Sequence, residues 1–163
     1  MPARPRMTPL PLTPAQVRVL SKIAEGKTAD QIAAELSITA GTVSVQLTSI
    51  GRKLGVSGRA ALVHAGYLTK QLPQPSRETF GGEFTGIEMQ TWRLVASGAK
   101  LQRAADASQV SRDAARERVK VLRRRVGAAN DAQLVTLGWC YGVVDDSLTD
   151  MASGVLIAVP VSG

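Results

Sequence analysis

Apolar residues recur at helical spacing in four consecutive segments of the first half of the chain. Three of these segments begin at a threonine that can cap a helix, namely Thr13, Thr28 and Thr39. Their apolar positions are Val17, Leu20, Ile23 and Ala24, then Ile32, Ala33 and Leu36, then Val43, Leu47, Ile50 and Leu54. A fourth segment covers about residues 57–67, and the pattern as a whole predicts four short helices.

The same pattern returns without a gap in the second half of the chain, at a constant shift that carries Thr13 onto Thr85, here called the repeat offset. Residues 12–67 and their shifted counterparts share ten identities, mostly at positions that cap or pack helices, and Gly26 aligns with Gly98. The second set of caps is Thr85, Ser111 and Asn130, and its apolar positions are Trp92, Val95, Ala96, Ala115, Val119, Leu122 and Val126. An ungapped internal repeat indicates two copies of one small domain.

The predicted fold is therefore all-α, with two tandem four-helix domains. Residues 1–11 contain four prolines and two arginines and are expected to form a disordered basic arm. The domains cover residues 12–72 and 84–142, joined by a linker at residues 73–83 that is rich in proline and glycine. The tail, residues 143–163, fits either one or two short strands or a disordered end. Because each copy has its own caps and apolar stripe, each is expected to fold separately.

The net charge of +7 is carried mainly by the two predicted domains, at +4 and +5, whereas the tail carries −3. A basic body suits a polyanionic partner such as nucleic acid. His64 and Cys140 are the only residues of their kinds, so no zinc site and no disulfide can form within the chain, and a reducing cytoplasm is expected. His64 is expected at the surface, Cys140 as a small packing residue, and Tyr67 and Trp139 as core or inter-helix contacts.

No segment is expected to enter a membrane or to catalyse a reaction. The longest apolar run, residues 155–161, is too short to span a bilayer. There is no glycine-rich phosphate loop, no acid–base pair and no nucleophile with a histidine partner, so we expect neither an enzyme nor a bound cofactor or metal.

The first copy resembles the LuxR-type helix-turn-helix family of bacterial transcription regulators. The resemblance is carried by Leu12-Thr13, Gly26, Gln31-Ile32-Ala33, Ile38-Thr39, Thr42-Val43, Ile50, Lys53-Leu54-Gly55-Val56, Arg59 and Leu62-Val63. The second copy resembles the family only through the first, because Ser108 stands where Leu36 does and Ala114-Ala115 replace Thr42-Val43.

The resemblance implies that the third helix of each copy lies in the major groove of DNA. In the first copy it places Thr42, Ser44, Val45 and Thr48 on the reading face. Arg52 and Arg59 are either ordinary surface charges or phosphate contacts, and phosphate contact is favoured. Through the repeat, the corresponding region of the second copy supplies Arg112, Arg116, Glu117, Lys120, Arg123 and Arg124. Arg116, Lys120 and Arg124 take the places of Ser44, Thr48 and Arg52, so the second copy carries the charge that the first lacks.

The expected function is a sequence-specific regulator that binds double-stranded DNA with two helix-turn-helix modules in one chain, in the cytoplasm and nucleoid of a bacterium or in a phage. One alternative is an interaction module that binds RNA polymerase, another regulator or an antagonist, favoured by the uncharged third helix of the first copy. A further alternative is an architectural DNA-binding protein without sequence preference. In the family the fourth helix commonly pairs two subunits, so a homodimer formed through this helix or the tail is also considered.

Overall fold

The structure is a computed structural model that describes residues 9–151 and 154–155. Helices form almost all of the regular structure in these residues, which confirms the predicted all-α fold class. The helices are α1 (Pro14–Ala24), α2 (Ala29–Leu36), α3 (Ala40–Leu54), α4 (Arg59–Leu68), α5 (Gly86–Ala96), α6 (Leu101–Ser108), α7 (Arg112–Val126) and α8 (Asp131–Cys140). In the tail, β1 (Asp150–Met151) and β2 (Gly154–Val155) pair antiparallel, so short strands form there. The predicted arm lies mostly outside the described residues.

Helices α1–α4, here the first half, have 11, 8, 15 and 10 residues, and α5–α8, the second half, have the same four lengths. Each helix of the second half begins at the repeat offset from its counterpart, as Pro14 and Gly86 illustrate.

The caps expected from the sequence are present. Thr13, Thr28 and Thr85 each form a capping box, in which the threonine hydroxyl accepts from the backbone N–H three residues on. Thr39 and Ser111 cap α3 and α7 through the same bond from the hydroxyl to the backbone. These local bonds satisfy backbone groups that a helix end leaves open, which is why the helix starts were predictable.

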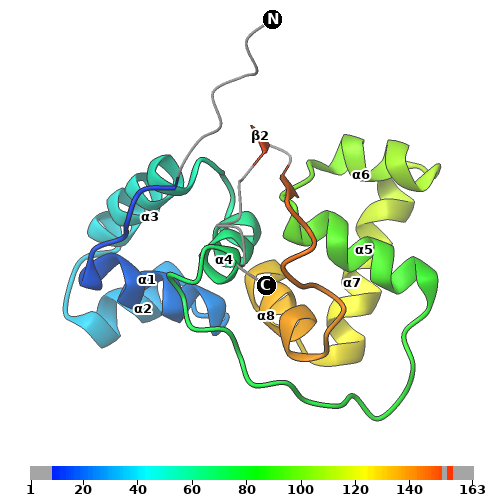
Figure 1. Cartoon of the computed structure of the whole chain (residues 1–163), viewed down its shortest axis with the longest axis horizontal. Helices are drawn as coiled ribbons and strands as arrows, with labels where there is room; N and C mark the ends of the chain where they lie inside the picture. Colours follow the sequence, from blue (N-terminus) through cyan, green and yellow to red (C-terminus); the bar gives the residue numbers. More distant parts are fainter. Residues whose placement is uncertain (1–8, 152–153, 156–163) are drawn as a thin grey trace, which may run out of the picture.

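The two halves share one hydrophobic core. Figure 1 shows α4 and α8 at the centre, with α1–α3 on one side and α5–α7 on the other. Every residue of α4 from Ala61 to Leu68 is buried, and α4 packs on α8 and α5 as well as on α1 and α3. The two halves therefore pack against each other through α4 and α8, and the expectation that each half folds separately stays a prediction.

His64 is fully buried on α4, so the expectation of a surface position is wrong. A sequence window around residue 64 shows only a short amphipathic helix, and the neighbour that covers this helix, α8, lies far along the chain. Tyr67 and Trp139 are buried inter-helix contacts, as expected, and Cys140 is buried with its thiol donating to the carbonyl oxygen of Ser76 at 3.2 Å.

The contacts between the halves are reciprocal under the repeat offset. The Tyr67 hydroxyl lies 3.0 Å from the Thr136 hydroxyl, and the Trp139 indole N–H donates to His64 at 3.0 Å. Tyr67 corresponds to Trp139 and His64 to Thr136, so each pair is the other with the halves exchanged. Contacts in which residue i of one unit meets j of the other, and j meets i, are those of a two-fold interface.

Gly66 and Gly138 allow close approaches within the first half and within the second half, respectively. A Cβ on Gly66 would lie 2.8 Å from Leu20, and one on Gly138 would lie 2.7 Å from the Trp92 indole nitrogen. Trp92 occupies the position of Leu20 in the second half. The same two glycine positions thus serve the same packing purpose in both halves.

Candidate nucleic-acid interface

In each half a short helix is followed, after three residues, by a longer helix with an exposed outer face, α3 in the first half and α7 in the second. Ser37, at the end of α2, and Gln109, at the end of α6, both take the left-handed conformation, with φ 56°. This conformation turns the chain sharply before the caps of α3 and α7. In the first half this arrangement is a helix-turn-helix, in which the second helix is the one that enters a DNA groove, and the second half repeats the same helix lengths and turn conformation.

The exposed face of α3 is almost uncharged. Thr42, Ser44, Val45 and Thr48 line this face, and Val45 reaches 68% exposure, unusual for a valine. The Thr48 hydroxyl donates to the carbonyl oxygen of Ser44 at 3.1 Å. The only cation of the predicted reading set on this helix is Arg52, near its C-terminal end.

Arg52 and Arg59 are exposed and line one groove of about 660 Å³ between α3 and the start of α4. The structure thus brings together the two arginines for which phosphate contact is favoured over a role as ordinary surface charges. Thr48 lines the same groove, which connects these arginines to the outer face of α3.

The outer face of α7 is charged. Arg112, Arg116, Glu117, Lys120 and Arg124 lie on it, and the spacing i, i+4, i+8 places three of the cations in one row. Arg116 forms an ion pair with Asp113 at 3.0 Å, and Arg124 with Glu117 at 3.3 Å. Exposed pairs of this kind are weak, so both guanidinium groups can exchange their partner for a phosphate or a base.

Arg123 lies apart from this row. Its guanidinium donates to the carbonyl oxygen of Ala129 at 2.8 Å and lies 3.7 Å from Asp131, at the turn between α7 and α8. A cation there offsets the partial negative charge at the end of α7. Of the predicted site residues, Arg123 is the one whose contacts point to a structural role.

A basic residue near the end of α3 and another near the end of α7 tie these helices to the start of the first helix of their half. Lys53 donates to the Gln16 side chain at 2.7 Å, and Arg125 donates to Glu88 at 2.5 Å. The repeat offset carries Gln16 onto Glu88 and Lys53 onto Arg125, so the two ties are equivalent. Burial would raise the pKa of the Glu88 carboxyl, but the hydrogen bonds from Arg125 and from the Thr85 backbone outweigh burial and lower it.

Sequence reasoning missed these ties, including the one that Arg125 forms with Glu88. Its guanidinium also lies over the rings of Phe80 and Phe84, 5.3 and 5.2 Å from their centroids. The recurrence of a polar residue at 16 and 88 with a basic one at 53 and 125 was the available signal.

Comparisons with known proteins agree with the helix-turn-helix architecture of the first half. Residues 10–65 match the family model described as bacterial regulatory proteins, luxR family. The match confirms the LuxR-type resemblance of this segment and supports a DNA-binding transcription regulator in general. Comparison with curated proteins and with solved structures found no match. Within the described residues, no helix has the length and apolar character needed to cross a membrane.

Proposed function

We propose that this protein is a sequence-specific regulator that binds double-stranded DNA through two helix-turn-helix modules in one chain. The observation that carries the proposal is the pair of outward-facing helices α3 and α7, each following a sharp turn, with the family match covering the first of them. The matching lengths of the helices in the two halves, together with their constant repeat offset, support a tandem repeat with a divergent second copy.

The α4–α8 contact takes the place that a subunit interface takes in a dimeric regulator. Its reciprocal pairs, Tyr67 with Thr136 and Trp139 with His64, support an internal dimer held in one chain. The halves then present two different reading surfaces, polar and nearly uncharged on α3 and cationic on α7. An asymmetric target site follows from this difference, because each reading helix selects bases through its own side chains.

In vitro selection of bound duplexes from a random pool tests the proposal. We expect the full chain to enrich one asymmetric motif. The R116A/K120A double variant should lose most of this enrichment. The matched control, R18A/K70A, removes the same charge from positions on α1 and after α4, away from α7, and should select like the parent. Retention without selection would identify an architectural binder and would contradict the proposal.

A second candidate function is docking to a protein, RNA polymerase or another regulator, through α3. The observation that favours it is the exposed Val45 on a nearly uncharged face, which suits a protein surface better than a phosphate backbone. Under this reading the second half alone binds DNA. V45E would then abolish binding to the protein partner in a pull-down while leaving the affinity for DNA unchanged.

A further inference from the structure

A cavity of about 660 Å³ lies where the second half meets the start of α4, bounded by α5, α6 and α7 and by the N-terminal ends of α4 and α8. Its apolar wall is formed by side chains such as Leu94, Leu101, Ala104 and Val119. Pockets that hold small organic molecules have this size and this mostly apolar lining. The cavity therefore has the dimensions of a ligand site, in a region that the DNA-reading faces do not explain.

The cavity exists because side chains of the second half are shorter than their counterparts in the first. Ala104, Ser108 and Ala115 line it, and their counterparts under the repeat offset are Ile32, Leu36 and Val43. Ile32 and Val43 are fully buried and fill the corresponding space between α1, α2 and α3. Cavities in cores are destabilising, so three large-to-small differences around one space favour a function for that space. Leu101, which also lines the cavity, is larger than its counterpart Ala29, so the size difference at this position is reversed.

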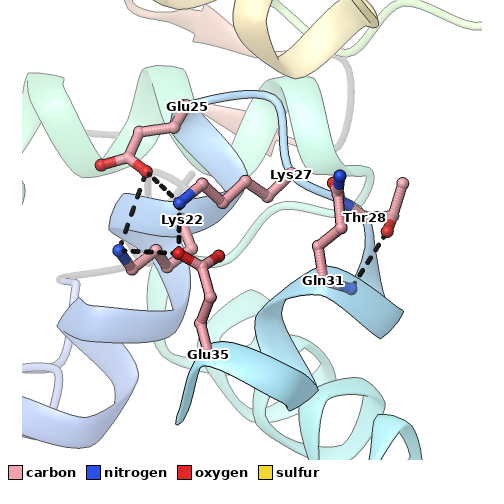
Figure 2. A network of polar contacts seen from close by, with 6 residues as sticks. All are labelled: Lys22, Glu25, Lys27, Thr28, Gln31 and Glu35. Carbon is pink, nitrogen blue, oxygen red and sulfur yellow. Dashed lines mark hydrogen bonds and ion pairs between the residues drawn. The ribbon is translucent and has the colours of Figure 1, made fainter.

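In the first half, a network of ion pairs covers the surface that corresponds to the cavity. The described residues of the second half have no counterpart of this network. Figure 2 shows Lys22 and Lys27 joined to Glu25 and Glu35 by ion pairs of 2.5 to 3.9 Å, which tie α1 to α2. The corresponding residues in the second half are Leu94, Ala99, Ser97 and Ala107. Leu94 and Ala99 line the cavity, so an ion-pair network is replaced by an apolar opening.

The rim of the cavity is cationic. Arg59, Arg116, Arg118, Lys120 and Arg123 line it, against one carboxylate, that of Asp131. Within the described part of the chain, Arg59, Arg118 and Lys120 form no ion pair. The Nε atom of Arg123 is buried and has no hydrogen-bond acceptor among the described atoms. A buried donor without an acceptor is rare in proteins, so the Arg123 side chain is held beside the cavity with one of its donors unsatisfied.

We propose that this cavity binds a small organic anion with an apolar body, such as a medium-chain or aromatic carboxylate. The apolar body would lie against Leu94, Ala104 and Val119, and the carboxylate would accept hydrogen bonds from the guanidinium groups at the rim. Arg116 and Lys120 belong both to this rim and to the outer face of α7. This step rests on the proposed function: if α7 reads DNA, the ligand competes with DNA for these two cations.

The binding test uses no DNA, so its outcome is separate from that of the DNA-binding proposal. The full chain is titrated with anilinonaphthalene sulfonate, an aromatic anion that fluoresces in apolar sites. Decanoate is then added as a competitor, and decanol serves as its uncharged counterpart. We expect saturable binding of the dye to the folded protein at one site and full displacement by decanoate.

Two variants locate the site. A104I/S108L introduces the residues that stand at the corresponding positions of the first half, Ile32 and Leu36. It should reduce the affinity for the dye by at least about tenfold without lowering the melting temperature. A107I adds the same bulk as A104I to a position of α6 outside the cavity and should bind like the parent. R118Q should weaken the binding of decanoate about tenfold and leave the binding of decanol unchanged. This variant tests the proposal even if the double variant fails to fold. Undiminished dye binding by A104I/S108L in folded form, or equal binding of decanoate by R118Q and the parent, would overturn the proposal.

Discussion

The indole N–H of Trp139 donates to Nδ1 of His64 at 3.0 Å, and the Nε2 atom of the same histidine lies 2.7 Å from the carbonyl oxygen of Leu148. A carbonyl only accepts, so Nε2 must carry the proton and Nδ1 must be free to accept from the indole. His64 is therefore neutral in the folded protein. Burial lowers the pKa of His64, with the Leu148 carbonyl acting in the opposite direction.

This relationship predicts that stability falls on mild acidification. Above the ordinary histidine pKa of 6.5, His64 is neutral in both the folded and the unfolded chain, and its contribution to the stability of the fold is complete. As the pH falls below that value, the unfolded chain takes up a proton that the folded chain resists, and the free energy of unfolding decreases by up to about 1.4 kcal/mol per pH unit. Urea unfolding at pH 7.5 and pH 5.5 measures the change. H64Q, although less stable throughout, should show a smaller difference between the two pH values, and an equal difference would contradict the assignment.

Packing at Gly138 predicts a sharp loss of stability in G138A. The new Cβ would lie 2.7 Å from the Trp92 indole nitrogen and 2.8 Å from Val144, both buried. Overpacking of this kind typically costs about 1–3 kcal/mol. The matched control is G86A at the first position of α5, where a Cβ meets nothing within 4 Å. It should be neutral or slightly stabilising in the same urea titration, and equal loss in both variants would show that the contact at Gly138 does not limit packing.

Loss of charge from α7 should weaken DNA binding in two distinguishable ways. R116A is expected to cost about 1–3 kcal/mol and to relax preference at one base pair, as for a bidentate base contact. K120A is expected to weaken binding to all DNA sequences about equally and to lower the salt dependence of binding, as for a phosphate contact. Affinities for the selected site and for random duplexes, each at several salt concentrations, separate the two effects. If both variants bind like R18A and the parent, α7 does not read DNA.

Cleavage of the linker tests whether the halves depend on each other. Gly81 and Gly82 are exposed, and a protease site inserted between them can be cut in the folded protein. We expect the two fragments to stay together on size-exclusion chromatography, because the α4–α8 contact buries His64, Tyr67 and Trp139. Fragments that elute separately, each with its helical circular dichroism intact, would show two independent domains instead.

If α3 and α7 both read DNA, as proposed, we expect an asymmetric footprint of roughly two helical turns of DNA. In footprinting experiments, the S44A/T48A variant of α3 should leave one end of the site unprotected from cleavage. The R116A/K120A variant of α7 should leave the other end unprotected. One chain should suffice, since covalent linkage makes the second contact intramolecular. A symmetric footprint that never depends on α3 would contradict the two-module proposal and would favour a protein partner for that helix.

Sequence alone determined the parts of this protein that depend on near neighbours. A capping threonine bonds a backbone N–H three residues away, as Thr13 and Thr85 do, and an apolar stripe is set by steps of three and four residues. Helix bounds, turns and the exposed faces of α3 and α7 follow from such spacings. The repeat offset was visible for the same reason, because it is a pattern of letters that requires no contact.

Only the tertiary structure decided how the halves meet. His64 and Trp139 are 75 positions apart, and nothing local in either helix indicates that one covers the other. Each fourth helix is short and apolar on more than one face, so its partner in the other half is chosen by the shape of the packed side chains and by polar pairs such as Tyr67 with Thr136. The cavity also depends on the tertiary structure. In the sequence, Ala104 and Ser108 are ordinary helix residues. They leave a space because α5 and α7 are held in place by their own packing and do not close over the short side chains.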